Sequence, residues 1–259
     1  MCTLIIFYKM FRNYPVVALH NRYEKRGTLE RPPKIVEGRF RVFCPIDVKS
    51  GGTWIGFNEK GLFAAVTDQH TALPVKTAKS RGELMLTILR NFSSAENAAN
   101  YLKENFGLGY KRGNFVVLDS EKGYHIIYDE KMIMRALGKG IHVITNLMAV
   151  EGIKIPPEAV GVFKLAEIRR KRAIKLAKSV PINGIENAIS KLKRIAADHG
   201  EGKSRKSICY HDEVEDWTMT SSIIIAVSKN IVNSKILYCI GNPCENSFQD
   251  YSYVIKETL

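Results

Sequence analysis

Cys2 is the residue whose place in the chain first suggests chemistry. It follows the initiator methionine in the opening segment MCTLIIFY, and cysteine is small enough for that methionine to be removed in most cells. Removal gives Cys2 a free α-amine, whose ordinary pKa of about 7.7–8.0 suits a general base. The thiol is a strong nucleophile once it is deprotonated. One residue would then supply both halves of a catalytic pair. The alternative is a small apolar residue that opens a strand.

Three further segments carry polar residues suited to such a reaction. HNRYE contains Arg22, and HVITN ends in Asn146. An arginine can hold a substrate carboxylate or favour the thiolate of Cys2, although a structural salt bridge is the alternative. The neutral amide of Asn146 can donate a hydrogen bond to an oxyanion without adding charge, and here the alternative is a turn at a strand end. The third segment, GGTWIGFNEKGLFAAVTD, ends in Asp68.

Composition and charge limit the classes of protein that fit. The 259 residues are 45% hydrophobic and 25% charged, which is typical of a soluble globular protein. The net charge of +13 favours anionic partners, and a solvated basic surface is the alternative. The basic run at residues 169–172 lies in a stretch whose charges fall all round a helix. We therefore expect a solvated outer face there, and no nucleic-acid binding.

Cysteine usage and hydropathy indicate a cytoplasmic protein. The five cysteines are odd in number, widely scattered and free of CxxC pairs, so reduced thiols are expected. LIIF is too short for a signal-peptide core, and no apolar run approaches the roughly 18 residues of a membrane span. Cys209 stands beside His211 and Asp212, but no second cluster completes a tetrahedral set. We therefore predict no metal site and no membrane-spanning segment.

Both ends of the chain consist mostly of short apolar segments. These segments must position Cys2, Arg22 and the other candidate site residues. TLIIFY and PVVAL are predicted strands, with HNRYE following the second, and WIGFNEKGLFAAV predicts a hairpin. Two helices are predicted to begin at Ser80 and Ser93, each followed by Glu at the third position as in a capping box. NFVVLDS, YHIIYDE, MIMRAL and IHVITN then predict four antiparallel strands.

The rest of the chain repeats this order. Residues 155–180 and 184–198 each predict a helix, GEGKSRKS a basic loop, and SSIIIAV, KILYCIG and YSYVIKE the final strands. Segregated blocks of strands and helices favour an α+β fold with antiparallel sheets. We expect one domain over residues 1–259, a four-layer αββα sandwich of two sheets between helical layers. Its N-terminal strand would be central, with Cys2 facing a cleft.

The four segments in this order resemble the NRDE family, also called the transport-and-Golgi-organisation-2 family. The resemblance rests on the Cys2 start, the NR-E pattern in HNRYE, GGTWIG and HVITN, and extends through SRGELMLTIL to TSSIIIAV. That family is similar to the N-terminal-nucleophile hydrolases, whose cysteine members include bile-salt and penicillin V acylases. Their fold is a four-layer αββα sandwich.

The resemblance implies an amidohydrolase that acts on a small, anionic substrate and requires no cofactor. Cys2 would be the nucleophile, with Arg22 beside it. Asn146 and the backbone N–H of Asp68 would hold the oxyanion. The remaining motif residues are predicted to line the substrate site: His20, Asn21, Tyr23, Glu24 and Trp54. The oligomeric state is not predicted.

The chain departs from the family pattern at two positions. Tyr23 stands where the family has Asp, and Met219 where it tends to have Arg. We expect these changes to remove charge around the cleft. Glu24 is a substitute for the lost carboxylate, although strand alternation turns it away from the face of residue 23. The resemblance also implies a second function, non-catalytic binding and trafficking of haem or an acyl ligand in the same cleft, with Cys2 or a histidine as the axial ligand.

Overall fold

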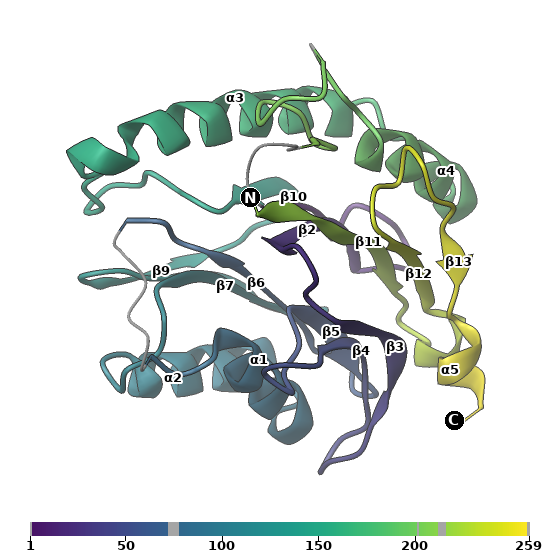
Figure 1. The fold of residues 1–259 in the computed structure, drawn as a ribbon. Coiled ribbons are helices and arrows are strands. Elements are labelled where there is room, and N and C mark those ends of the chain that lie inside the picture. Colours follow the sequence, from purple (N-terminus) through teal and green to yellow (C-terminus); the bar gives the residue numbers. More distant parts are fainter. Residues whose placement is uncertain (1, 72–77, 201, 212–215, 258–259) are drawn as a thin grey trace. The chain divides into compact units, whose positions relative to one another are not determined.

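The structure is a computed structural model that describes residues 2–71, 78–200, 202–211 and 216–257. The chain divides into two compact units that interleave along the sequence (Figure 1). The first unit comprises Met1–Thr28, Lys139–Thr145 and Lys164–Leu259, and the second comprises Leu29–Gly138 and Asn146–Phe163. The prediction of a single domain stays a prediction.

The first unit is built on a six-stranded antiparallel sheet with the strand order β10-β1-β2-β11-β12-β13. Strand β1 has a hydrogen-bonded neighbour on each side, as expected for the N-terminal strand. The strands are β1 (Thr3–Tyr8), β2 (Val16–Lys25), β10 (Gly140–Thr145), β11 (Trp217–Val227), β12 (Lys235–Ile240) and β13 (Gln249–Asp250).

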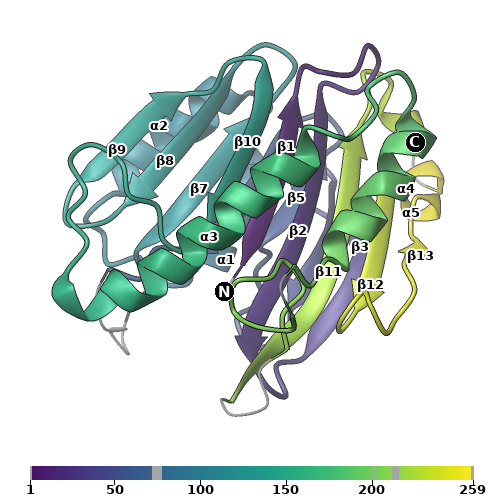
Figure 2. The ribbon, with the colours of Figure 1, turned by 90° about the horizontal axis from the view of Figure 1, so that it is seen from above.

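Helices α3 (Val160–Ala177) and α4 (Ile185–Ala196) lie along one face of this sheet (Figure 2). The buried residues of α4 recur at helical spacing, which gives that helix a continuous apolar stripe. The stripe packs against Ile5, Phe7 and their neighbours on β1, β2 and β11. We call this side of the sheet the helix face. Helix α3 follows a short 3-10 turn, η1 (Pro157–Ala159), and η2 (Ile231–Asn233) lies between β11 and β12.

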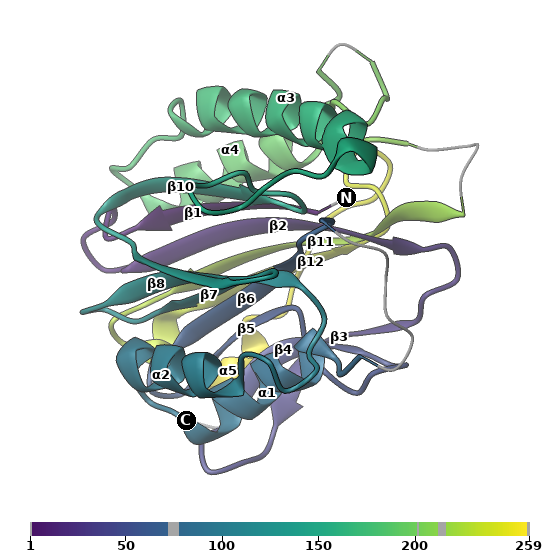
Figure 3. The same ribbon diagram turned by 90° about the vertical axis from the view of Figure 1, so that its left-hand side faces the viewer.

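The second unit is a seven-stranded antiparallel meander in which sequential strands are neighbours from β3 to β9. Helices α1 (Arg81–Asn91) and α2 (Ala95–Asn105) cover one face of it (Figure 3). The strands are β3 (Glu30–Val36), β4 (Val42–Asp47), β5 (Ile55–Asn58), β6 (Phe63–Asp68), β7 (Gly113–Leu118), β8 (Gly123–Tyr128) and β9 (Met132–Ala136). Two antiparallel sheets, each with a pair of helices, confirm the α+β fold class.

Four expectations about the elements were wrong in detail. The second helix is capped by Ser94, whose hydroxyl accepts a hydrogen bond from Asn97 N, and not by Ser93. HNRYE continues strand β2 instead of following it. IHVITN forms β10, which pairs with β1 and not with β9. YSYVIKE contains the helix α5 (Tyr253–Lys256), in which the adjacent residues Val254 and Ile255 are both buried, so no strand alternation exists there.

Strands β3 and β4 were not predicted. The two prolines in ERPPKIV argue against a central strand, because proline donates no backbone hydrogen bond. The structure places β3 at the edge of its sheet, with an irregular register between Arg31 and Lys34. Among the helices of the described residues, none is both long and apolar enough to cross a membrane.

Candidate active site

The register of three strands places Cys2 beside Arg22. Thr3 on β1 pairs with Asn21 on β2 and with Thr145 on β10. Because antiparallel partners run in opposite directions, the step before Thr3 brings Cys2 level with Arg22. The residue that follows Thr145 in the chain is Asn146. Cys2 is buried, with 7% of its surface exposed.

Alternation along β2 distributes the five residues of HNRYE between the two faces of the sheet. His20, Arg22 and Glu24 lie on the face opposite the helix face, as does Cys2, whereas Asn21 lies on the helix face. A guanidinium nitrogen of Arg22 is 3.8 Å from a carboxylate oxygen of Glu24. Glu24 therefore shares the Cys2 face and is the carboxylate nearest in sequence to Arg22.

Asn21 connects strand β2 by hydrogen bonds to the end of α4 and to the segment that follows it. Its amide nitrogen donates to the backbone oxygens of Ala196 at 2.9 Å and Ile208 at 3.1 Å. Its amide oxygen accepts a hydrogen bond of 2.7 Å from Ser222 Oγ on β11. The side chain is fully buried, and both of its ends bind protein. These contacts give Asn21 a structural role, in contrast to the substrate contact predicted from the motif.

Tyr23 lies on the helix face and stacks on Tyr210, with ring centroids 3.9 Å apart. Its hydroxyl donates to Tyr210 O at 2.6 Å and accepts from Tyr210 N at 2.7 Å. Burial raises the pKa of Tyr23 well above its ordinary value, with a smaller contribution in the same direction from Tyr210. Tyr23 is thus a neutral structural residue that holds the 202–211 segment against β2.

The two departures from the family pattern are cross-strand neighbours. Tyr23 pairs with Met219 on β11, and both lie in one buried cluster with Cys209 and Tyr210. The two positions where the family resemblance implies Asp and Arg thus hold a buried pair without charge in this chain. Because Tyr23 lies on the helix face, the expectation that these changes strip charge from the surface around Cys2 was wrong.

Arg169 on α3 is the cation that sequence reasoning missed. It is fully buried, its Nε donates to Thr3 Oγ1 at 3.0 Å, and its Nη1 donates to Arg205 O at 2.6 Å. Burial lowers the pKa of Arg169, while electrostatic interactions with Tyr210, Tyr23 and Cys2 oppose that shift. A buried positive charge therefore acts on Cys2 from the helix face.

The prediction of a solvated face for the basic run at residues 169–172 was wrong for Arg169, which is buried, whereas Lys171 is exposed as predicted. Arg169 falls in line with Ala166, Ala173 and Ala177, the other buried residues of α3. This spacing of three and four residues was the signal available in the sequence. Arg170 pairs with Glu167 on the same helix.

In the second unit, Asp68 ends strand β6 inside a charged network. One carboxylate oxygen pairs with Arg81 of α1, and the other lies 3.3 Å from His70 Nε2. Burial alone would raise the pKa of Asp68, but Arg81 and His70 together hold it well below its ordinary value. His70 N donates to Asn146 O at 3.0 Å. The two residues predicted to hold an oxyanion, Asp68 and Asn146, are thus joined through His70.

Trp54 and the GGTWIG motif serve the packing of the second unit. Trp54 is buried before β5, and its backbone oxygen accepts from Val66 N at 2.9 Å. Gly52 meets the first turn of α1 so closely that a Cβ there would lie 2.2 Å from the Gly82 carbonyl carbon. The motif therefore requires glycine for a strand-to-helix contact.

Replacing Asp68 with asparagine is expected to make the free energy of unfolding less dependent on pH in the acidic range. Because the folded pKa is depressed, the stabilisation is fully present above the unfolded pKa of about 3.9 and is lost as pH falls through the folded pKa. The free energy of unfolding of the wild type should therefore fall more steeply below about pH 4 than that of Asp68→Asn. Urea titrations between pH 2 and 7 measure this; parallel profiles would contradict it.

Comparison with known proteins decides the family. A family model described as Transport and Golgi organisation 2 matches residues 1–236. The chain belongs to this family. No curated protein matches the sequence of this transport and Golgi organisation 2 family member.

Solved structures establish the fold of this family member. Penicillin V acylase from Agrobacterium tumefaciens matches with a TM-score of 0.61 at 14% identity, over 92% of this chain and 83% of the acylase chain. A Caenorhabditis elegans N-acylethanolamine-hydrolysing acid amidase orthologue gives 0.55 at 12% identity, over 87% and 92% of the two chains. The C2A mutant of conjugated bile acid hydrolase from Clostridium perfringens gives 0.53 at 13% identity, over 97% and 96%. The fold is that of the N-terminal-nucleophile hydrolases.

Proposed function

We propose that this protein hydrolyses a carbon–nitrogen amide bond of a small, anionic substrate, with Cys2 as the nucleophile after removal of Met1. The observation that carries the proposal is the setting of Cys2. The residue directly precedes β1, level with Arg22, and the buried guanidinium of Arg169 interacts with it electrostatically. Positive charge near a thiol favours the thiolate, which is the reactive form.

The reaction has two halves. The α-amine of Cys2 takes the thiol proton, and the sulfur attacks the amide carbon to form a tetrahedral oxyanion. The carbon–nitrogen bond then breaks, and the leaving amine receives the proton held by the α-amine. Water adds to the resulting thioester, releases the carboxylic acid and restores the thiol.

The oxyanion requires two fixed hydrogen-bond donors. We assign them to the Asn146 side chain and the backbone N–H of Asp68, as the family resemblance implies. Asn146 continues β10 by one residue beyond Thr145, the partner of Thr3. The hydrogen bond from His70 N to Asn146 O supports a fixed arrangement of these two donors.

The fold neighbours suggest which amides to try. By their names, they act on penicillin V, on N-acylethanolamines and on conjugated bile acids. Of these three classes, penicillin V and conjugated bile acids carry an acidic group, and Arg22 on the Cys2 face is the cation that we assign to such a group. We therefore expect the anionic amides to react faster than the neutral N-acylethanolamine.

The proposal is tested by trapping the acyl group on natively produced protein. Intact mass spectrometry first establishes whether Met1 is absent. The protein is then incubated with penicillin V, a conjugated bile acid or an N-acylethanolamine, quenched in acid, and its peptides are mapped. We expect the acyl mass on the peptide that begins with Cys2. Cys44 and Cys239 serve as internal controls, because burial raises their thiol pKa values to about 12 and about 11.

Two results would overturn the proposal. One is Met1 retained on protein that nevertheless hydrolyses an amide. The other is processed protein that neither acquires an acyl group nor releases an acid from any of the three substrates. In that case the non-catalytic alternative is examined by haem titration, in which a Soret shift that disappears in Cys2→Ala would favour haem binding.

A further inference from the structure

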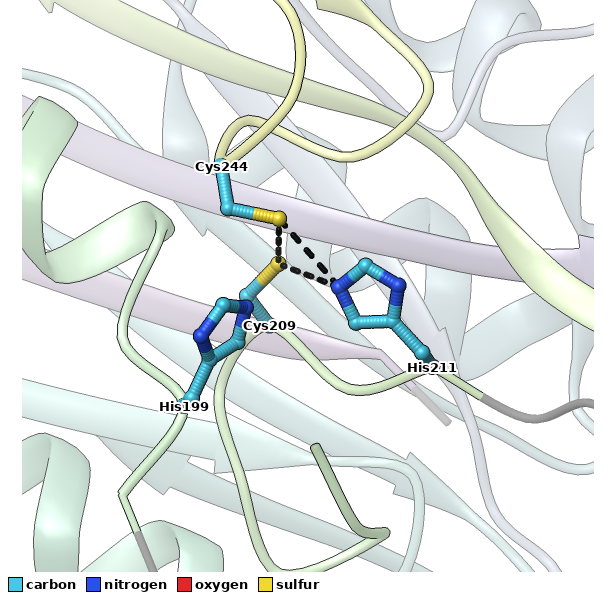
Figure 4. A group of neighbouring side chains, drawn as sticks. All are labelled: His199, Cys209, His211 and Cys244. Carbon is cyan, nitrogen blue, oxygen red and sulfur yellow. Dashed lines mark hydrogen bonds between the residues drawn. The ribbon is translucent and has the colours of Figure 1, made fainter. Parts of the chain in front are cut away.

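A cluster of four metal-ligating side chains lies in the first unit, apart from the residues assigned to catalysis. It consists of His199, Cys209, His211 and Cys244 (Figure 4). One ligand atom from each residue lies within 4.8 Å of all the others. The first three residues lie in the chain between α4 and β11, and Cys244 lies in the turn between β12 and β13.

The spacings between the ligand atoms fit a tetrahedral zinc ion. Zinc binds thiolate sulfur at about 2.3 Å and imidazole nitrogen at about 2.0–2.1 Å, so tetrahedral ligands lie roughly 3.3–3.8 Å apart. The sulfurs of Cys209 and Cys244 are 3.6 Å apart. The Nε2 atom of His211 lies 3.2 Å from Cys244 Sγ and 3.9 Å from Cys209 Sγ. Shifts of a few tenths of an ångström bring these three atoms to zinc-ligand spacing. The ligand atom of His199 lies within 4.8 Å of the other three, so it completes the site with a shift of up to about one ångström.

His199 supplies a second, independent observation. Its Nε2 atom is buried and has no hydrogen-bond partner among the residues that the structure describes. A buried ring nitrogen without a partner is destabilising, and a bound cation removes that cost. The ring lies beside that of His211, with centroids 5.3 Å apart, and Figure 4 shows it next to Cys209.

Backbone and charged contacts hold the ligand segments in place. Cys209 N donates to Asp198 O at 2.9 Å, and His211 N donates to Lys203 O at 3.2 Å. Asp198 in turn pairs with Arg172 of α3 at 2.8 Å. Lys203 and Glu245 are 3.7 Å apart, which joins this segment to the turn that carries Cys244.

The outer ring nitrogen of His211 also has suitable surroundings. When Nε2 binds a metal, Nδ1 carries the proton and needs an acceptor. A Glu245 carboxylate oxygen lies 3.5 Å from Nδ1 and can accept that proton. The amide nitrogen of Asn242 lies 2.8 Å from Nδ1, so a 180° rotation of this amide would present its oxygen as a second acceptor. A hollow of about 320 Å³ borders His211, Asn242 and Glu245, which gives an ion access from solvent.

We propose that His199, Cys209, His211 and Cys244 bind one zinc ion. Two sulfur and two nitrogen ligands are the donor set of structural zinc sites, and four protein ligands leave no position open for a substrate. The site is therefore structural. It does not depend on the proposed function, since none of its ligands takes part in the amide hydrolysis.

The ion would stabilise the strand that bears Arg22. Tyr210 lies between two ligands in the sequence, Cys209 and His211, and its ring stacks on Tyr23 of β2. A metal that fixes Cys209 and His211 thereby fixes the Tyr23–Tyr210 pair. Sequence analysis expected no such site because its ligands come from three places in the chain. Asp212, considered there as a ligand, lies outside the described residues.

Metal analysis of the full-length protein tests the proposal. Protein purified with a reductant and dialysed against metal-free buffer is expected to retain about one zinc per chain by elemental mass spectrometry. Replacement by cobalt(II) should give the visible absorption of a tetrahedral site together with a thiolate charge-transfer band. Removal of the metal with a chelator should lower the melting temperature by about 5 °C or more.

Single substitutions identify the ligands. Cys209→Ser, Cys244→Ser and His199→Ala should each lower the zinc content of the dialysed protein at least tenfold. The two cysteine variants should also lose the thiolate charge-transfer intensity of the sulfur that is removed. The matched control is Cys239→Ser, a buried cysteine of β12 outside the cluster, which should keep one zinc. His211→Ala tests the remaining ligand in the same way.

Three results would overturn the zinc site. The first is protein that holds no zinc and binds no cobalt(II) while all four side chains are reduced. The second is a mass lower by two hydrogens in reductant-free protein that reverses with reductant and leaves metal binding absent, which would make Cys209 and Cys244 a disulfide pair. The third is equal zinc content in the wild type and the Cys244→Ser variant.

Discussion

Cys2→Ala is expected to abolish acyl transfer to the protein and to reduce amide hydrolysis by at least about 10³-fold. The substitution removes the nucleophile and leaves the surrounding sheet intact, because alanine fits the small buried site before β1. Alanine also permits removal of Met1, so the variant differs from the wild type only at the sulfur. Rates are measured with whichever of the three amides acylates the wild type.

A second variant separates the thiol from the amine. Inserting one glycine between Met1 and Cys2 leaves the thiol in the chain but moves the free α-amine to the added residue. Hydrolysis should fall nearly as far as in Cys2→Ala, since the proton acceptor is displaced. Cys239→Ser is the control for general thiol chemistry and should retain the wild-type rate. Undiminished activity in the glycine variant would show that the α-amine is not the base.

Arg169→Ala is expected to be the most destabilising single change outside the apolar core, lowering the free energy of unfolding by about 3–5 kcal/mol. The substitution leaves a cavity under α3 and removes the donors that bind Thr3 Oγ1 and Arg205 O. For a chain of this size, the melting temperature should fall by about 10 °C. Urea and thermal denaturation measure the change.

Two further variants identify the source of that effect. Lys171→Ala, at an exposed position of the same helix, should change the stability by less than about 0.5 kcal/mol. Arg169→Met fills the space without donating hydrogen bonds, so it should recover part of the loss. Equal stabilities of Arg169→Ala and Lys171→Ala would contradict the assignment of a buried, hydrogen-bonded guanidinium.

Local patterns predicted most strands, but not which strand pairs with which. The alternation in IHVITN predicts the strand β10. No local pattern predicts that β10 pairs with β1 and not with β9, the strand that precedes it in the chain. The edge strand β3 was not predicted because it contains two prolines, and proline is usually evidence against a strand. Val254 and Ile255 were placed in a strand because a short apolar run has no decisive period.

The sequence predicted those parts of the candidate site whose residues share a motif or a strand. Cys2 and Arg22 follow from the segment order, and the register places them level. The role of residue 23 could not be predicted, because it depends on Tyr210, which contacts it from a loop far away in the sequence. Cys209 and His211 were considered as metal ligands, but His199 and Cys244, which complete the cluster, come from other parts of the chain. Arg169 differs from these cases, since its position in the buried stripe of α3 was visible in the sequence.

The pairing of β1 with β10 has a consequence for biosynthesis. While the ribosome is still adding the first few dozen residues, the strand behind Cys2 has only β2 available as a partner. At about 5–20 residues per second, β10 emerges on the order of ten seconds later. During that interval the removal of Met1 that the proposed function requires would take place beside an open sheet edge. The late arrival of β10 then closes that edge, so the timing of translation itself leaves a period for maturation of the amino terminus.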